Sequence, residues 1–178
     1  MQDPKSQPAH IEVFQIEVLP ATPEQKPVVA NLLELYAHDF SDFQDLELGP
    51  DGRFGYRDLD LYWSEPGHHP FLIKVDGKLA GVVLLKRETN PQGDGNLWDV
   101  AEFFVLRGYR RRGIGTHVAH HVWKQFPGAW QVRVMERNLK AVQFWERTVM
   151  RFAGESANTA CLERGGARWR VFTFCNQL

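Results

Sequence analysis

The residues of this 178-residue chain that are best suited to chemistry stand together at positions 110–116. They are Arg110, Arg111, Arg112, Gly113, Ile114, Gly115 and Thr116. A helix that begins here would point free backbone N–H groups and the positive end of its dipole at one spot. Glycine keeps side chains away from that spot and adopts positive φ without strain, and each guanidinium donates several hydrogen bonds to phosphate oxygens. The segment therefore predicts a phosphate-binding turn.

Two other phosphate-binding motifs do not fit these residues. A Walker loop requires Gly-Lys before Ser or Thr, whereas Gly115 directly precedes Thr116. The dinucleotide-binding motif G-x-G-x-x-G requires a third glycine where this chain has Val118. The remaining alternatives are a phosphate site of another kind and a basic surface turn that binds no ligand.

The pattern R-x-x-G-x-G resembles the acyl-CoA pyrophosphate loop of the GNAT superfamily of N-acetyltransferases. A second segment strengthens the resemblance, because Asn138, Ala141 and Phe144 match the signature N-x-x-A-x-x-F-Y and Trp145 stands at its last position. The two motifs have the order and spacing of the family. By motif, the resemblance covers roughly residues 70–152.

The elements that must hold these motifs follow from the periodicity of the apolar residues. Thr22-Pro23 predicts a helix start, and Asp76-Gly77 and Gly165-Gly166 predict hairpin turns. The predicted strands are 10–19, 71–75, 78–85, 97–106 and 130–135. The predicted helices that follow the two motifs are 116–126 and 139–149. This order is that of the GNAT fold. The resemblance thus implies an α/β (α+β) fold with a mixed central sheet of about six or seven strands flanked by helices.

Composition predicts one domain over residues 10–178, because 43% hydrophobic residues can bury one good core and no repeat is visible. The polar residues 1–9 are expected to be disordered. The net charge of -1 argues against binding to nucleic acid or a membrane. No signal peptide or membrane span is visible, so a cytoplasmic location is expected. Cys161 and Cys175 are expected to be reduced thiols, far apart on the last hairpin.

The resemblance implies acetyl-CoA as co-substrate and direct transfer of its acetyl group to a primary amine in a ternary complex. In the family, the pantetheine arm bonds the exposed backbone of the fourth strand, which here assigns it to Phe103, Phe104 and Val105. Asn138 and Trp145 complete the acetyl-CoA site expected around the 110–116 loop. No metal is expected: His117 and His121 stand four residues apart, but the glutamate of a zincin and a third ligand are missing.

Two acids on strand 97–106 are candidate general bases. Asp99 falls where several family members carry a glutamate base, and Glu102 lies three residues nearer the cofactor. Strand alternation places them on opposite faces unless a bulge intervenes, and the resemblance implies such a bulge. A carboxylate beside an apolar cleft has a raised pKa and can accept the proton of an amine, whereas structural roles are the alternative for both acids.

Trp145 departs from the family pattern, in which many members carry a tyrosine that protonates the departing thiolate. An indole N–H is too weakly acidic for this step. Another donor, a water molecule or the ammonium group of the substrate must then supply the proton. The alternative function is a non-catalytic acyl-CoA-binding or sensor protein of the GNAT fold.

The acceptor amine stays open among small amines, amino sugars and peptide N-termini. A run of acids covers the region that borders the acceptor cleft in the family, and it would attract a cationic amine: Asp39, Asp42, Asp45, Glu47, Asp51, Asp58, Asp60 and Glu65. The aromatic residues Phe40, Phe43, Phe54, Tyr56, Tyr62 and Trp63 could shape the pocket, and solvated loops over a core are the alternative. The expected partner is a small-molecule or peptide amine, without nucleic acid or membrane, and a homodimer stays open.

Overall fold

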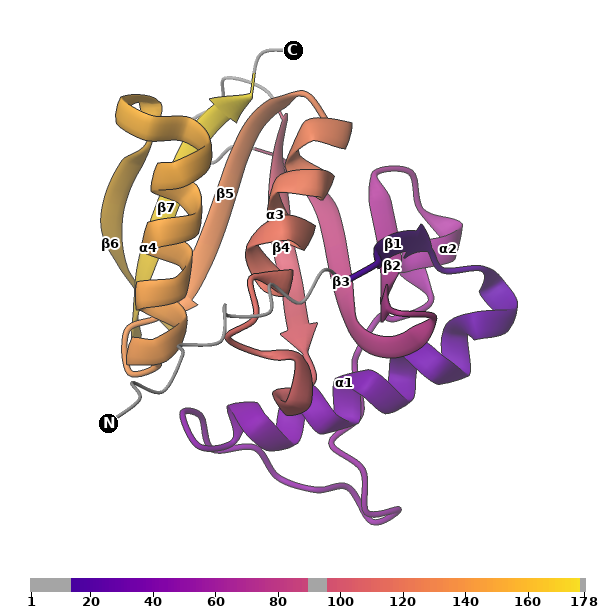
Figure 1. Ribbon diagram of the computed structural model, residues 1–178. Helices are drawn as coiled ribbons and strands as arrows, with labels where there is room; N and C mark the ends of the chain where they lie inside the picture. Colours follow the sequence, from indigo (N-terminus) through magenta and orange to yellow (C-terminus); the bar gives the residue numbers. More distant parts are fainter. Residues whose placement is uncertain (1–13, 90–95, 177–178) are drawn as a thin grey trace, which may run out of the picture.

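A seven-stranded sheet with helices on both faces organises the chain (Figure 1). The computed structural model describes residues 14–89 and 96–176. The strand order is β1-β2-β3-β4-β5-β7-β6, in which β4 and β5 are parallel and the other neighbours are antiparallel. The strands are β1 (Ile16–Pro20), β2 (His68–Val75), β3 (Lys78–Thr89), β4 (Asn96–Val105), β5 (Gly128–Met135), β6 (Asn158–Arg164) and β7 (Ala167–Asn176). The mixed sheet predicted from the sequence is confirmed.

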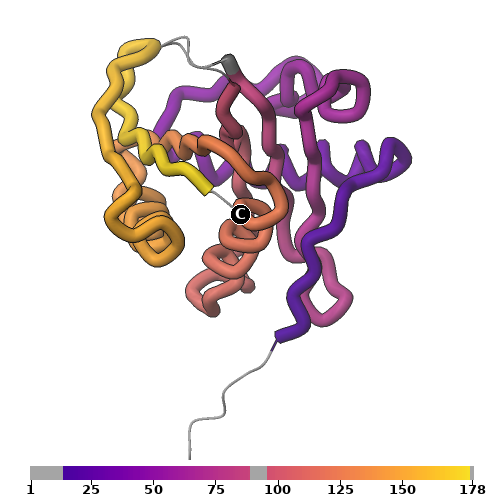
Figure 2. The backbone as a smooth tube through the Cα atoms, turned by 90° about the horizontal axis from the view of Figure 1, so that it is seen from above, coloured from indigo at the N-terminus to yellow at the C-terminus, as the bar shows by residue number. Residues whose placement is uncertain are grey.

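The helices divide between the two faces of the sheet. Helix α1 (Lys26–Phe40) lies on one face, and α3 (Ile114–Gln125) and α4 (Leu139–Ala153) lie on the other, as Figure 2 shows from above. A short helix, α2 (Leu61–Ser64), precedes β2. Each face has its own apolar cluster, one joining α1 to Val82, Leu84 and Phe104, the other joining α3 and α4 to Val83, Val105, Val132 and Phe172. The sheet residues alternate between these two clusters, as the period of a strand requires.

Local signals in the sequence set several element boundaries. Thr22 begins the first helical segment, where its N–H donates to Gln25 Oε1 at 3.0 Å, as the predicted helix start requires. Asp76 and Gly77 have φ of 50° and 72°, the positive values of the predicted two-residue hairpin turn. Helix α3 begins at Ile114, two residues before the predicted start at Thr116.

Other predictions shift or fall outside the described residues. Within the described residues, the first strand begins at Ile16, after Phe14 and Gln15, which the prediction had included in it. Residues 10–13 of that prediction, and the disorder expected for residues 1–9, lie outside the described residues. Cys161 lies opposite Arg170 in the last hairpin, and both cysteines are exposed free thiols, as predicted. Within residues 14–89 and 96–176, no helix is long and apolar enough to cross a bilayer.

The sheet opens between its two parallel strands. Strand β4 pairs with β5 only at Trp98 and Asp99, although it pairs with β3 along its whole length. Ala101 is an extra residue in β4, because Val100 lies opposite Leu85 and Glu102 lies opposite Leu84. Such a bulge bends a strand and increases its twist. Beyond Asp99, the edge of β4 that faces β5 therefore has no neighbouring strand among the described residues.

Candidate active site

A cleft of about 750 Å³ occupies the opening between β4 and β5. Its floor comes from residues 100–103 of β4 and residues 132–135 of β5. Helix α1 and residues 43–47 and 54–56 line one side, Asn138, Ala141 and Trp145 line a second, and the β6–β7 hairpin lines a third. The cleft thus joins elements from both faces of the sheet.

The bulge at Ala101 places the two candidate bases on one face of β4. Asp99 lies opposite Lys86 and Glu102 lies opposite Leu84. Since Lys86 and Leu84 are two residues apart on β3, their partners point to the same side, which is the side of α1. The bulge implied by the family resemblance is confirmed, and it turns a three-residue spacing into a same-face pair.

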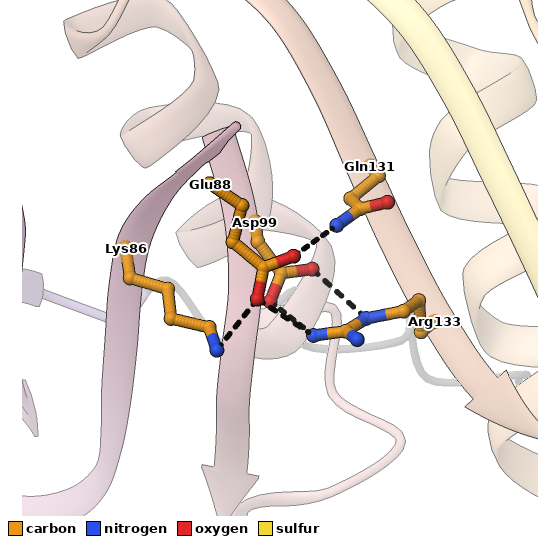
Figure 3. A network of polar contacts seen from close by, with 5 residues as sticks. All are labelled: Lys86, Glu88, Asp99, Gln131 and Arg133. Carbon is orange, nitrogen blue, oxygen red and sulfur yellow. Dashed lines mark hydrogen bonds and ion pairs between the residues drawn. The ribbon is translucent and has the colours of Figure 1, made fainter. Parts of the chain in front are cut away.

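Asp99 belongs to a closed polar network (Figure 3). Its side chain is fully buried, and its two oxygens accept from Arg133 Nη2 at 2.6 Å and Arg133 Nε at 3.2 Å. Glu88 accepts from Gln131 at 2.9 Å and pairs with Lys86 at 2.7 Å. Burial raises the pKa of Asp99, and Arg133 opposes that rise. Asp99 does not line the cleft, so this carboxylate ties β4 to β5 where the strands still pair.

Glu102 has the opposite surroundings. It lines the cleft, just past the point where β4 and β5 separate. Burial raises the pKa of Glu102 to about 7, although hydrogen bonding from Tyr36 and Tyr56 lowers it. Both tyrosines also line the cleft. A half-buried carboxyl with a pKa near neutrality can take up and release a proton at physiological pH.

The phosphate-binding turn predicted from the sequence leads from β4 into α3. Gly113 is the N-cap residue of α3 and has φ of 78°, which glycine adopts without strain. The N–H of His117 donates to the carbonyl of Gly113 at 3.0 Å, so the N–H groups of residues 114–116 lie at the open end of the helix. Arg111, Arg112 and Gly113 are exposed beside them. This end of α3 has the geometry of an anion site.

Three residues of the turn make structural contacts that the sequence did not show. A Cβ atom on Gly115 would lie 3.0 Å from Phe144 Cζ, so this glycine lets α3 approach α4 closely. Arg110 donates to the carbonyl of Val105 at 2.6 Å and to Asp39 at 2.6 Å, which ties the turn to the end of α1. Arg112 stacks over Phe14, with its guanidinium carbon 4.5 Å from the ring centre. Binding of phosphate by these side chains stays a prediction.

The open edge of β4 offers part of the backbone expected to act at Phe103, Phe104 and Val105, because the carbonyl of Val105 already accepts from Arg110 and that of Phe104 lies against Gly81 of β3. This edge of the strand faces the opening, because β5 has separated from it. The side chains are committed to packing: Phe104 and Val105 are buried in the two apolar clusters, and the ring of Phe103 lies 4.9 Å from that of Trp145. Only main-chain N–H and C=O groups are therefore offered to a pantetheine arm, in the manner of an added strand.

Asn138 and Trp145 lie on the α4 side of the cleft. The side chain of Asn138 caps α4 by accepting from the N–H of Ala141 at 3.0 Å, as predicted. Trp145 is 6% exposed and contacts Phe103 and Phe144 by their ring edges. Both residues line the cleft. Their contact with acetyl-CoA stays a prediction.

The acidic rim expected over the acceptor region is smaller in the structure than in the sequence. Of the eight acids, only Asp45 and Glu47 line the cleft. Asp39 pairs with Arg107 and Arg110, and Asp60 pairs with Lys26. Among the aromatic residues, Phe40, Phe43, Phe54 and Tyr56 line the cleft, whereas Tyr62 is buried in the core and Trp63 bonds the carbonyl of Ala21.

Several cleft residues were missed by the sequence reasoning. Tyr36 was not among the candidate site residues, and its hydroxyl faces Glu102. Arg133, Arg164 and Trp169 were not singled out at all. One signal was available for Arg133: with Gln131 it places a polar side chain at every second position of strand 130–135, which is typical of a sheet face without a covering helix.

Comparison with known proteins agrees with this geometry. The sequence model of the acetyltransferase (GNAT) family matches residues 29–149, more than half of the chain. The chain belongs to the GNAT family. No curated protein matches it in sequence.

Solved GNAT structures share the fold over nearly the whole chain. An acetyltransferase of the GNAT family from Streptococcus pneumoniae has 17% sequence identity and a TM-score of 0.62, and the match covers 92% of this chain and 100% of that one. NAA60 from Arabidopsis thaliana, in complex with a bisubstrate analogue, has 18% identity and a TM-score of 0.60 over 92% of this chain and 100% of its own.

Another structure of Arabidopsis thaliana NAA60, in complex with acetyl-CoA, has 16% identity and a TM-score of 0.57 over 90% of this chain and 98% of its own. Within the described residues of this GNAT protein, no group of three or more His, Cys, Asp or Glu could hold a metal ion.

Proposed function

We propose that this GNAT protein transfers the acetyl group of acetyl-CoA to a primary amine by direct attack, with Glu102 as the general base. The observation that supports this most strongly is the position of Glu102 in the cleft, with a pKa of about 7. Asp99 is the weaker candidate, because both of its oxygens are bonded to Arg133. The neighbours with bound acetyl-CoA and a bisubstrate analogue add support for the co-substrate.

In the proposed reaction, Glu102 accepts a proton from the ammonium group of the acceptor. The freed amine nitrogen then forms a bond to the thioester carbonyl carbon, and the bond from that carbon to sulfur breaks. In this scheme the N–H groups along the open edge of β4 orient the thioester, which the separation of β5 from that edge supports. The thiolate leaves with the electron pair of the broken bond and takes the proton that Glu102 holds. The carboxylate so restored accepts the second proton, which the nitrogen loses as it becomes an amide, and releases it to solvent.

Glu102 can also supply the proton that Trp145 cannot. A carboxylic acid with a pKa of about 7 is more acidic than a typical thiol, for which cysteine with a pKa of about 8.5 is the reference. Transfer from protonated Glu102 to the thiolate is therefore downhill. One carboxyl group then serves as base and as acid, and no tyrosine is required at position 145.

No acyl-enzyme is needed in this scheme. Cys161 and Cys175 are exposed and do not line the cleft, and a nucleophile would have to face the thioester. The acceptor is expected to be a small-molecule or peptide amine. The cytoplasmic location, the absence of nucleic acid partners and the open question of a homodimer stay predictions from the sequence.

The test compares Glu102→Gln with the wild-type protein in an assay of thiol release from acetyl-CoA with a panel of primary amines. We expect turnover to fall by about 10²- to 10⁴-fold, the usual contribution of a general base. In the wild-type protein, kcat/KM should rise with pH through about 7, because only the ionised carboxylate of Glu102 accepts a proton.

Calorimetry with acetyl-CoA separates chemistry from binding. The variant should keep the affinity of the wild-type protein. Tight binding of acetyl-CoA by the wild-type protein without turnover of any amine would instead support the alternative of a non-catalytic acyl-CoA-binding or sensor protein. Mass spectrometry after incubation with acetyl-CoA alone should find no acetylated protein.

A further inference from the structure

One wall of the cleft is an open face of the sheet. On the side of α1, this helix packs against β3 and β4. The side chains that β7 and β6 present on the same side are half-buried or exposed, including Trp169, Leu162 and Arg164. The register places these residues together, because Trp169 lies opposite both Met135 and Leu162. All of them line the cleft that contains Glu102.

This wall carries hydrogen-bond donors that have no acceptor. Within residues 14–89 and 96–176, the guanidinium groups of Arg137 and Arg164 have no ion-pair or hydrogen-bond partner. The indole Nε1 of Trp169 is buried and also lacks a partner in this part of the chain. Trp169 Nε1 is the buried donor of the three, and a buried donor without an acceptor costs free energy. The guanidinium groups of Arg137 and Arg164 are exposed, so water can bond them and a bound anion can reach them. Arg133 differs, because Asp99 and Glu88 already bond it.

The donors are close enough to act on one group. Arg164 lies opposite Ala167, and Leu162 lies opposite Trp169, so Arg164 and Trp169 are diagonal neighbours on the same face. Diagonal neighbours in an antiparallel pair lie about 7 to 8 Å apart, within reach of long side chains. A guanidinium offers a planar pair of donors that matches a carboxylate.

The facing wall has the opposite charge. Asp45 and Glu47 line it, and the carboxylate of Glu34 accepts from the N–H groups of Phe54 at 2.8 Å and Gly55 at 2.9 Å. Acids and unpartnered arginines thus face each other across the cleft, with Glu102 in its floor. This separation of charge suits a molecule with a cationic end and an anionic end.

We propose that the acceptor carries a carboxylate as well as its primary amine, and that Arg164 and Trp169 bind this carboxylate, with Arg137 beside them. The inference rests on the proposed function, because it requires the amine to lie at Glu102. Trp169 stands two strands from Glu102, and because β4 and β5 separate here the span exceeds the roughly 10 Å of two ordinary strand spacings, which long side chains shorten again. An extended dipeptide measures about 7 Å, so a dipeptide-sized acceptor spans the cleft better than a free α-amino acid.

The experiment measures kcat/KM for matched acceptors, each as the free acid and as the carboxamide. The panel consists of glycyl dipeptides and their amides, 6-aminohexanoic acid and its amide, and butylamine as an amine without an anionic group. The wild-type protein should prefer each acid over its amide by about 10- to 100-fold, the contribution of charge-assisted hydrogen bonds. Arg164→Gln should lower kcat/KM for the acids to the level of the amides.

Arg168→Gln is the matched control, because Arg168 stands next to Trp169 on the other face of the hairpin, where it pairs with Glu136. It should keep the preference for acids, and Arg164→Lys should keep part of it. Equal rates for acids and amides in the wild-type protein, or acetylation of butylamine and the amides alone, would overturn the carboxylate site and leave acetyl transfer intact. No acetylation of any member of the panel, together with no binding of acetyl-CoA, would overturn the proposed function itself.

Discussion

Strand β4 holds two carboxyl groups, three residues apart, in different surroundings. Asp99 lies where β5 still runs beside β4, and Arg133 bonds both of its oxygens. Glu102 lies where β5 has moved away, so its carboxyl meets a cleft and two tyrosines instead of an arginine. The two residues share a face of the strand, so orientation does not separate them.

The difference shows that strand separation decides which acid is free to react. Where the strands pair, Arg133 bonds the carboxylate of Asp99 and opposes the rise in its pKa that burial causes. Where they separate, the carboxylate is desolvated without a cation against it, and its pKa rises. The same opening that admits a pantetheine arm therefore also prepares the candidate base.

Asp99→Asn should have the largest effect on stability of the substitutions considered for β4. It leaves Arg133 half-buried without its main partner, so the free energy of unfolding should fall by about 3 kcal/mol or more, as is usual when one member of a buried ion pair is removed. Turnover of the protein that remains folded should change less than tenfold. Urea unfolding and an assay at a temperature well below melting check both points.

Glu88→Gln is the control for that prediction, because it alters a more exposed member of the same network. It should cost clearly less stability. If Asp99→Asn instead kept its stability and lost a hundredfold or more in turnover, Asp99 would be the base and the comparison between the two acids of β4 would fail.

Glu102→Gln should raise the stability of the protein, in contrast to Asp99→Asn, and the size of the increase should depend on pH. Since the pKa of Glu102 is raised from 4.5 to about 7 in the folded state, folded protein binds this proton more tightly than the unfolded chain between those values. The wild-type protein therefore loses stability as the pH rises through this window. At pH 8, Glu102→Gln should be more stable than the wild type by about 1 to 3 kcal/mol.

The difference in the free energy of unfolding between Glu102→Gln and the wild type should shrink as the pH falls toward 4.5, because Glu102 then becomes neutral in the unfolded state as well as in the folded state. Unfolding measured in urea at a series of pH values gives this curve directly. A variant that is less stable than the wild type at pH 8 would show that the ionised carboxylate is well solvated or paired, and would remove the contrast with Asp99.

Substitution of Trp145 should have the smallest effect on turnover. It contacts Phe103 on the face of β4 opposite Glu102, and if Glu102 carries out both proton transfers, the indole only packs. Trp145→Phe should lower stability by roughly 1 to 3 kcal/mol through lost packing. Its turnover should follow that loss and no more.

Trp145→Tyr is the companion variant. It tests whether a hydroxyl in this position reaches the sulfur and raises turnover. A hundredfold loss of turnover in Trp145→Phe, with unchanged melting and unchanged acetyl-CoA affinity, would show that the indole takes part in the reaction.

The sequence alone determined the local features of this protein. Thr22-Pro23, Asp76-Gly77 and Asn138 act through their own backbone or the next turn, so their helix starts and hairpin turn could be predicted without a fold. The strand, basic glycine turn and helix around Gly113 are also contiguous in the chain. These segments carried the family resemblance and the fold.

Only the tertiary structure decided how the candidate site is divided. The separation of β4 from β5 depends on a bulge and on the register of strands about 30 residues apart in the chain. The sequence alone therefore could not show which of Asp99 and Glu102 faces the cleft. Arg110 looked like a phosphate ligand and is tied to Asp39, 71 residues away. Arg164 and Trp169 join the cleft because β7 and β6 extend the sheet beyond the reach of α1, and such long-range packing leaves no periodic signal in the chain.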